Sequence, residues 1–393
     1  MDIWQKINKG VFIIAEAGKN FIQSQEEKSV AEYLENAKKL VDEAAASGAD
    51  AIKFQTHNVE DEQLNINVTS PHFKGADRYG WVKRNTLSTP VKEFWKPLKE
   101  HCDRRGIIFF STPMSRGAAK ILNEQIGVDP VRSRARDGVA SPGDRGAATS
   151  NGVDLWKIGS GDILDFVMLD YLRQTGKPII ISSGMSTLEE VEKAVGFLRE
   201  KNLRVSLLHC VSKYPCPAEE LRLRTMDLYK KKFDLPIGFS DHSVGIESSL
   251  VAVAMGARVI EKHFSLSRDL WGSDHKVSMT PGELAGLVAG VKRIEADPAE
   301  RERVLATEFA KKTMAEEGKV LQEGEAVFRP LFRKSLMAAR DIEAGETVNA
   351  EMLYAMRPQQ YAGGLPSEEY PNILGKEVKK AIKRFGPITR EVI

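Results

Sequence analysis

Eight short apolar segments, each followed by a stretch with helical periodicity, constrain the fold of this chain more than any other feature. Strands that alternate with helices pair in parallel through right-handed crossovers. Eight such units within roughly 250–300 residues are the content of a (β/α)8 TIM barrel. A doubly wound open sheet is the alternative, although no Gly-x-Gly-x-x-Gly follows the first segment as a dinucleotide fold requires. The expected strands are Val11–Ala17, Ala51–Gln55, Ile107–Ser111, Leu155–Gly159, Pro178–Ser182, Val205–Cys210, Pro236–Phe239 and Val259–Phe264.

The pattern changes after the barrel region, which we expect to span residues 1–299. Residues 300–328 are charged and typical of a helical linker. Short apolar pieces separated by glycine-containing turns then predict a small β-rich domain over residues 329–393. Residues 130–154 are rich in Arg, Gly, Ala and Ser and interrupt a helix-to-strand connection, so we expect a disordered insertion there. The pieces of the C-terminal domain are Lys334–Ala339, Glu346–Val348, Met352–Met356 and Lys376–Ile382.

Composition excludes several classes of partner. A net charge of +2 provides no strong field for nucleic acid or for an acidic membrane. No apolar run approaches the ~18–20 residues that span a bilayer, and the N-terminus lacks the apolar core and cleavage site of a signal peptide. The three cysteines form no Cys-x-x-Cys pair and suggest no disulfide framework. We therefore expect a cytoplasmic protein that binds neither nucleic acid nor membrane.

Polar residues are concentrated at the carboxyl ends of the expected strands. A single residue there would mean little, but such residues recur in nearly every strand–helix unit. In a closed barrel these ends converge on one face, where the catalytic residues of TIM-barrel enzymes lie. The pattern therefore indicates an enzyme. The residues are Glu16, Lys53, Gln55, Ser111, Thr112, Lys157, Ser160, Asp162, Ser182, Ser183, Ser212, Tyr214, Ser240, Asp241, His242 and His263.

Two histidines among these residues predict a metal site. His242 and His263 end the last two expected strands, and neighbouring parallel strands lie about 4.8 Å apart, so the two imidazoles can share one ion. Glu261 has the parity of His263, and Ser240 that of His242, so each pair points to one side of its strand. Imidazoles with oxygen ligands suit Mn²⁺, Co²⁺, Fe²⁺ or Zn²⁺. The alternative is a pair of hydrogen-bonded core histidines.

Two lysines predict an anion site. Lys53 and Lys157 lie within apolar strands, where an ammonium group is costly unless it meets an anion. Ser160-Gly-Asp and Ser182-Ser-Gly add hydroxyl and backbone N–H groups beside them, as in a phosphate or carboxylate site. A structural ion pair between Lys53 and Glu16 is one alternative. A Schiff-base lysine is another.

Three carboxylates complete the candidate site. Glu16 ends the first strand, Asp162 follows Ser-Gly, and Asp274 lies in the polar stretch Trp-Gly-Ser-Asp-His-Lys. Each is suited to hold sugar hydroxyls or to act as a general acid or base. For Asp274, a solvated carboxylate in a turn is an equal alternative.

Several motifs occur in order along the chain. They are Ile13-Ile-Ala-Glu-Ala-Gly-Lys-Asn, Ile52-Lys-Phe-Gln-Thr, Phe110-Ser-Thr-Pro, Trp156-Lys-Ile-Gly-Ser-Gly-Asp, Pro178-Ile-Ile-Ile-Ser-Ser-Gly-Met, Leu208-His-Cys-Val-Ser-Lys-Tyr-Pro, Ile237-Gly-Phe-Ser-Asp-His and Ile260-Glu-Lys-His-Phe. Together they resemble the sialic acid (N-acetylneuraminate, or nonulosonate) synthases. The tail, from Arg340-Asp-Ile-Glu-Ala-Gly-Glu-Thr-Val to Leu374-Gly-Lys, resembles the antifreeze-like (SAF) domain of that family.

The resemblance implies a reaction and a set of ligands. It implies condensation of phosphoenolpyruvate with an N-acetylmannosamine-type sugar, with release of phosphate by C–O cleavage and formation of a nine-carbon acid. His242 and His263 would hold Mn²⁺, or Mg²⁺ or Co²⁺, and Glu16 would be a catalytic carboxylate. Arg357 would reach the sugar N-acyl group of the partner subunit in a domain-swapped homodimer. Gln55 would contact substrate. The residues on the phosphoenolpyruvate side would be Lys53, Thr112, Lys157, Ser160, Ser183, Ser212 and Ser240, and those on the sugar side Asp162, Tyr214 and Asp274.

The chain departs from the family pattern at three places. Asn20-Phe21 replaces the usual Asn-His, Asp162 replaces the more common Glu, and Arg357-Pro-Gln-Gln replaces Arg-Pro-Gly. The last two changes affect expected sugar contacts, so the identity of the sugar stays open. The alternative functions are a Schiff-base aldolase that uses Lys157 and needs no metal, and a non-catalytic sugar-binding or interaction protein that needs no paired histidines.

Overall fold

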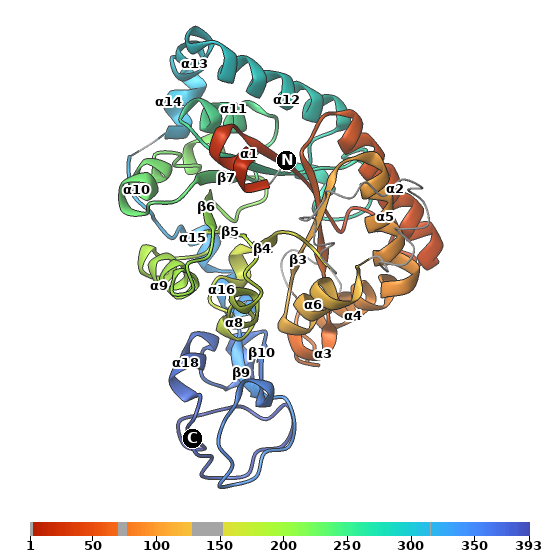
Figure 1. Cartoon of the computed structure of the whole chain (residues 1–393), viewed down its shortest axis with the longest axis vertical. Helices are drawn as coiled ribbons and strands as arrows, with labels where there is room; N and C mark the ends of the chain where they lie inside the picture. Colours follow the sequence, from red (N-terminus) through yellow and green to blue (C-terminus); the bar gives the residue numbers. More distant parts are fainter. Residues whose placement is uncertain (1–2, 70–76, 128–151, 315) are drawn as a thin grey trace, which may run out of the picture.

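Eight parallel strands form the central sheet of the computed structural model, which describes residues 3–69, 77–127, 152–314 and 316–393 (Figure 1). The strands are almost entirely buried, as expected of parallel strands covered on both faces. Each observed end lies within two residues of its predicted position. The strands are β1 (Phe12–Gly18), β2 (Ala51–Thr56), β3 (Ile108–Pro113), β4 (Trp156–Ile158), β5 (Ile179–Ser182), β6 (Val205–Cys210), β7 (Ile237–Asp241) and β8 (Val259–His263).

Pairing of the first strand with the last bends this sheet into a barrel. The hydrogen-bonded order is β3-β2-β1-β8-β7-β6-β5-β4, so β1 lies between β2 and β8. The two strands at the ends of this order, β3 and β4, contact each other. The prediction of a TIM-type barrel is therefore confirmed, and the open-sheet alternative is excluded because the first and last strands of the repeat are neighbours.

Amphipathic helices cover the outside of the barrel. α2 begins with a capping box in which Ser29 and Glu32 satisfy each other's backbone N–H groups, and α9 and α12 begin in the same way. Among the described helices, none combines the length and apolarity needed to cross a bilayer. The helices are α1 (Ile3–Lys9), α2 (Val30–Ala46), α3 (Val59–Glu62), α4 (Arg78–Ser88), α5 (Lys96–Arg105), α6 (Arg116–Lys120), α8 (Phe166–Gln174), α9 (Leu188–Arg199), α10 (Thr225–Lys232), α11 (Glu247–Ala254) and α12 (Pro281–Ala296).

The C-terminal domain forms a separate lobe below the barrel (Figure 1). Its strands β9 (Ser335–Ala338) and β10 (Leu353–Met356) pair antiparallel. The other two expected pieces, Glu346–Val348 and Lys376–Ile382, form isolated bridges rather than full strands. Val348, Val378 and Ile382 are buried there, but they do not make up the continuous alternating face that supports a full ladder. The lobe also contains α17 (Gln359–Ala362) and α18 (Tyr370–Ile373).

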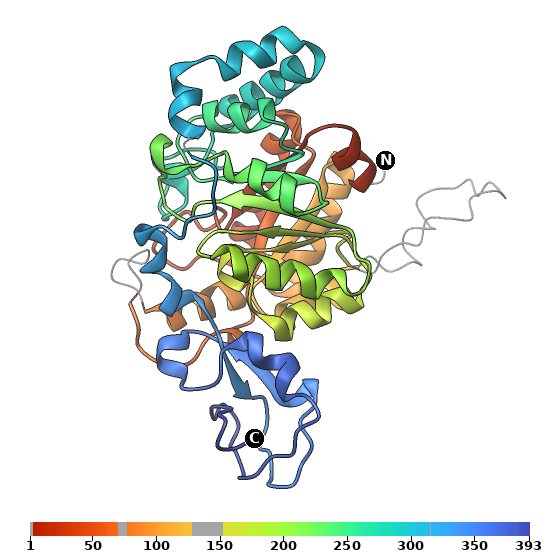
Figure 2. The ribbon, with the colours of Figure 1, turned by 90° about the vertical axis from the view of Figure 1, so that its left-hand side faces the viewer.

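The linker runs along the side of the barrel before it enters the C-terminal lobe (Figure 2). The lobe is held against the barrel by specific contacts, among them a 3.0 Å hydrogen bond from the Tyr370 hydroxyl to Asp170. The insertion predicted at residues 130–154 lies outside the described residues except for 152–154. The linker contains α13 (Pro298–Leu305), α14 (Glu308–Met314), α15 (Glu323–Ala326) and α16 (Arg329–Phe332).

Candidate active site

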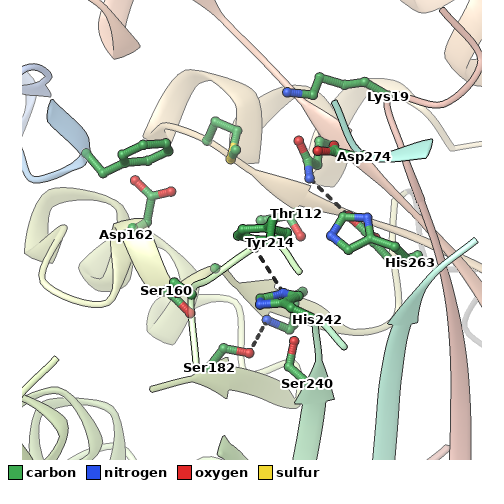
Figure 3. Close-up of a pocket in the computed structure, with 18 of the residues that line it drawn as sticks. Lys19, Thr112, Ser160, Asp162, Ser182, Tyr214, Ser240, His242, His263 and Asp274 are labelled. Carbon is green, nitrogen blue, oxygen red and sulfur yellow. Dashed lines mark hydrogen bonds between the residues drawn. The ribbon is translucent and has the colours of Figure 1, made fainter. Parts of the chain in front are cut away.

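The carboxyl ends of the strands open into one pocket, which the linker and the C-terminal domain also line (Figure 3). The structure brings together fourteen of the fifteen predicted site residues there. Ser183 is the exception. The fourteen are Glu16, Lys53, Gln55, Thr112, Lys157, Ser160, Asp162, Ser212, Tyr214, Ser240, His242, His263, Asp274 and Arg357.

Ser182, rather than Ser183, presents its hydroxyl to the pocket. The Ser182 hydroxyl accepts a 2.7 Å hydrogen bond from the ammonium of Lys157. The Ser183 hydroxyl instead donates to the Leu208 carbonyl at 3.0 Å, on the neighbouring strand β6. Because successive side chains at a strand end point in opposite directions, only one of the two serines can face the barrel interior.

Strand register places a buried ion pair at the mouth of the barrel. Glu16 of β1 lies opposite Lys53 of β2 and His263 of β8. The Lys53 ammonium lies 2.7 Å from Glu16 Oε2 and donates to the Thr112 hydroxyl at 2.9 Å. Burial alone would lower the pKa of Lys53, but Glu16 and Glu261 outweigh it and hold that pKa above its usual value. Lys53 is therefore a cation at neutral pH.

A second ammonium group lies close to the first. Lys157 Nζ is 3.6 Å from Glu261 Oε1, and Lys53 Nζ is 3.8 Å from the same oxygen. Burial lowers the pKa of Lys157, while the negative charge of Glu261 opposes that change. Two cations that share one carboxylate beside the Ser182 and Thr112 hydroxyls suit a small substrate with several negative charges.

The two predicted metal ligands line the same pocket as these lysines. The rings of His242 and His263 are 5.7 Å apart, and Tyr214 stacks on His242 with its hydroxyl 3.1 Å from His242 Nε2 (Figure 3). His242 Nδ1 donates to the Val211 carbonyl at 2.8 Å, so Nε2 is the nitrogen that faces the pocket. This fixed tautomer is what a histidine ligand requires.

His263 also has the chemistry of a ligand. Its pKa falls to about 4, chiefly because of burial and also because of His242 and Lys53, while Asp274 opposes the change. The ring is therefore neutral at pH 7, which is the form that binds metals. Its Nδ1 is buried without a hydrogen-bond partner among the described residues. His242 differs: burial would lower its pKa, but Cys210 and the Val211 carbonyl outweigh burial and hold that pKa above its usual value. The pair therefore fits a divalent ion that displaces the proton of His242.

Protein side chains supply only part of a coordination shell. Within the described ranges, no three His, Cys, Asp or Glu side chains cluster closely enough to hold an ion. An ion at the histidine pair would therefore take further oxygen ligands from substrate or water. That is the open arrangement of catalytic rather than structural metal sites.

The C-terminal domain completes the opposite side of the pocket. Arg357, which is fully buried, forms an ion pair with Asp162 within the same chain. Lys334 holds the same carboxylate at 2.9 Å and also contacts Asp165 at 2.7 Å. Burial would raise the pKa of Asp162, but Arg357 and Lys334 outweigh it and hold that pKa below its usual value. Asp162 is therefore an ionised acceptor fixed beside the guanidinium.

Several residues of the pocket were not predicted. The guanidinium of Arg78 lies 4.3 Å from the centre of the Phe332 ring, and Trp81 and Phe328 also line this region. They come from α4 and from the linker rather than from strand ends, so the barrel pattern contains no signal for them. Glu261 could have been predicted from the sequence, because its side chain points to the same side of β8 as that of His263.

A TIM barrel with paired lysines, hydroxyls and two imidazoles at its catalytic face defines an enzyme that acts on an anionic substrate. Comparison with known proteins agrees with this class. The NeuB family matches residues 40–132 and 140–302, and the SAF domain matches residues 333–391. The chain belongs to the NeuB family.

Named relatives extend over nearly the whole chain. An N,N'-diacetyllegionaminic acid synthase of Campylobacter jejuni is 32% identical over 95% of this chain and 98% of that protein. An N-acetylneuraminate-9-phosphate synthase of Mus musculus is 30% identical over 97% of this chain and 92% of that protein. The crystal structure of the spore coat polysaccharide biosynthesis protein SpsE of Bacillus subtilis superposes with a TM-score of 0.72 at 27% identity, covering 98% of this chain and 95% of that one. The chain is thus related to synthases of sialic-acid-type sugars that differ in their products.

Proposed function

We propose that this protein condenses phosphoenolpyruvate with an N-acylated, mannosamine-type sugar to a nine-carbon sialic-type acid and phosphate. One observation carries the proposal. The pocket contains two ammonium groups, Lys53 and Lys157, within 4 Å of one buried carboxylate, and the paired histidines line the same pocket. The ion-paired Asp162 and Arg357 line the same pocket, and we assign the sugar to them. Family membership supports a reaction of this type.

The geometry supports a sequence of steps in which atoms and charges balance. C3 of phosphoenolpyruvate attacks the sugar aldehyde carbon, whose oxygen takes up a proton, and positive charge develops at C2. Water adds to C2, and phosphate leaves with the bridging oxygen by C–O cleavage. Lys53 and Lys157 stabilise the negative charge on the departing phosphate. Glu16 lies beside Lys53 and lines the pocket, so it is placed to accept the proton that the attacking water loses.

We propose a divalent ion, Mn²⁺ in the first instance and otherwise Mg²⁺ or Co²⁺, as the cofactor. His242 and His263 would hold it. Such an ion supplies Lewis-acid polarisation of a carbonyl group. The buried, free Cys102, Cys210 and Cys216 agree with a reducing compartment, so we place the reaction in the cytoplasm.

The test is release of phosphate from phosphoenolpyruvate with a panel of sugars. The panel contains N-acetylmannosamine, its 6-phosphate and a 2,4-diacetamido sugar, each with Mn²⁺ and with EDTA. We expect release only when sugar and metal are both present, and the preferred sugar identifies the product class. Release that is independent of every sugar would contradict the proposal.

The ionisation of Glu16 predicts a pH dependence. Burial, with a contribution from Glu261, raises the pKa of Glu16 to about 7, against the opposing effect of Lys53. The carboxylate, which is the form that accepts a proton, therefore accumulates as the pH rises through 7. We expect kcat/KM to rise with an apparent pKa near 7, and Glu16→Gln to lower kcat about 100-fold and abolish this limb. Glu189→Gln, at an exposed position of α9, is the control. An unchanged pH profile in Glu16→Gln would refute the assignment.

We further propose a homodimer that exchanges C-terminal domains. In the single chain described here, Arg357 enters the pocket of its own barrel. Exchange would form the same Arg357–Asp162 contact between two subunits at little energetic cost, because the interface is unchanged.

Mixing two inactive variants distinguishes the arrangements. Arg357→Ala and His263→Ala damage different halves of the site. If domains are exchanged, co-refolded mixtures contain heterodimers with one intact site, and we expect activity to return to about a quarter of the wild-type value. If each domain serves its own barrel, no intact site forms and the mixture stays inactive. Size-exclusion chromatography of each variant verifies that dimers are present.

A Schiff-base aldolase is the second candidate, because burial lowers the pKa of Lys157 and so favours the neutral amine that this chemistry needs.

A further inference from the structure

The linker contains a buried carboxylate that the proposed chemistry does not use. Glu325 of α15 has no solvent exposure. It lies in residues 303–332, between the segments that match the NeuB family and the SAF domain. An ionisable group is costly to bury, so its contacts indicate what it does.

One oxygen of Glu325 joins two loops of the active site. Glu325 Oε1 accepts hydrogen bonds from the backbone N–H groups of Met185 and Ser212, each at 2.8 Å. Met185 follows β5 and Ser212 follows β6, and both residues line the pocket. Ser182, at the end of β5, and Ser212, in the loop after β6, supply hydroxyls of the proposed phosphoenolpyruvate site.

The conformation of Met185 explains why such a contact is needed. Met185 has a φ of +52°, in the left-handed region that non-glycine residues rarely adopt without support. Its carbonyl accepts 2.7 Å hydrogen bonds from Arg329 of the linker and from Arg333, the first residue of the segment that matches the SAF domain. The linker therefore holds both the N–H and the carbonyl of this residue.

Arg333 extends the contact to a third loop. Besides the Met185 carbonyl, it donates to the Ser186 hydroxyl at 2.9 Å and to the Ser160 carbonyl at 3.2 Å. Arg329 also forms a bidentate ion pair with Glu190 in the capping box of α9. The loops that follow β4, β5 and β6 are thus connected through one short segment, residues 325–333, at the end of the linker and the start of the C-terminal domain.

We propose that Glu325 and Arg333 are positioning residues that hold these loops in the conformation that binds phosphoenolpyruvate. This inference rests on the proposed function. Neither residue lines the pocket, so both act through the backbone groups they hold. Phe328 and Phe332 of the same segment line the pocket, and the Phe332 ring centre lies 6.0 Å from the Arg357 guanidinium, so the linker connects the anion subsite with the sugar subsite. Docking of the C-terminal domain is then required for phosphoenolpyruvate binding as well as for sugar binding.

The main test compares Glu325→Ala with Glu325→Gln. Alanine removes the acceptor of both N–H groups, whereas the glutamine oxygen still accepts them. We expect Glu325→Ala to raise the KM for phosphoenolpyruvate at least tenfold while the KM for the sugar changes less than threefold, and Glu325→Gln to stay within threefold of wild type for both. Glu323→Ala, at an exposed position of the same helix, is the matched control and should equal wild type. Equal increases in both KM values, or none, would overturn the proposal.

A second background separates positioning from general loss of stability. Glycine adopts a φ of +52° without steric cost, so Met185→Gly removes part of the need for support. In the Met185→Gly background, Glu325→Ala should still raise the KM for phosphoenolpyruvate, but by a factor at least threefold smaller than in the wild-type background. An equal penalty in both backgrounds would show that Glu325 does not act through Met185.

Two further measurements keep the test decisive. Calorimetry measures the binding of phosphoenolpyruvate in the absence of sugar. If the wild-type protein binds phosphoenolpyruvate but releases no phosphate with any sugar, the proposed function is contradicted, while the positioning role can still be tested by binding.

If Glu325→Ala does not fold, Arg333→Lys replaces it. A lysine keeps the charge but cannot span Ser160 and Met185 together, so weaker phosphoenolpyruvate binding by at least threefold is expected, and unchanged binding would overturn the proposal.

Discussion

Replacement of both His242 and His263 with alanine is expected to lower sugar-dependent phosphate release at least about 1,000-fold, with each single replacement close to that loss. Removing the two imidazoles removes the protein ligands of the proposed ion, and Lewis-acid catalysis contributes several kcal/mol, where each 1.4 kcal/mol corresponds to about tenfold in rate. Metal content by mass spectrometry and phosphate release are measured on the same samples. Bound ion and activity should disappear together.

The control for this pair is His101→Ala. His101 lies on α5, where its ring contacts Asp42 at 2.7 Å, and it does not line the pocket. It should retain both metal and activity. If the double variant keeps full activity, or loses activity while retaining stoichiometric metal, the histidine pair is not the metal site.

Lys157→Met is expected to abolish activity to a similar degree. Methionine is close to lysine in size but leaves Glu261 buried without one of its two cations, and it removes the donor to the Ser182 hydroxyl. We expect a loss of at least about 1,000-fold in kcat/KM for phosphoenolpyruvate, equivalent to about 4 kcal/mol of transition-state stabilisation. Steady-state kinetics with varied phosphoenolpyruvate measure it. Lys201→Met, on an exposed turn, is the matched control and should be unaffected.

The same residue decides between the two candidate reactions. A Schiff-base aldolase forms an imine between Lys157 and a carbonyl substrate, which borohydride traps as a stable adduct. We expect no adduct of the intact protein with pyruvate or product, and full sensitivity to EDTA. A trapped adduct on Lys157 together with EDTA-resistant activity would favour the aldolase.

The barrel and much of the pocket could be predicted because parallel strands covered on both faces leave apolar runs that end at polar, convergent positions. Glu16, Lys53 and His263 followed from this rule, and strand register brings them together. Ser182 and Ser183 could not be distinguished, because the sequence does not show on which residue β5 ends and the turn begins.

The remaining pocket residues depend on tertiary packing that local patterns do not encode. Arg78 and Phe332 are far apart in the chain and meet only where the linker crosses the barrel mouth. Glu325 lies in a charged stretch that resembles an exposed connector, yet it is fully buried because two loops direct N–H groups toward it. Beyond β9 and β10, the C-terminal pieces form only isolated bridges, because they bury single residues such as Val348, Val378 and Ile382 rather than a continuous face.

The central claim is that phosphoenolpyruvate joins a sugar with cleavage of its C–O bond. The most direct measurement uses phosphoenolpyruvate labelled with ¹⁸O at the bridging oxygen, together with the preferred sugar and Mn²⁺, and mass spectrometry of both products. We predict a nine-carbon acid formed in equal amount to phosphate, with the label in the phosphate. Unlabelled phosphate, or labelled pyruvate formed without consumption of sugar, would contradict the claim.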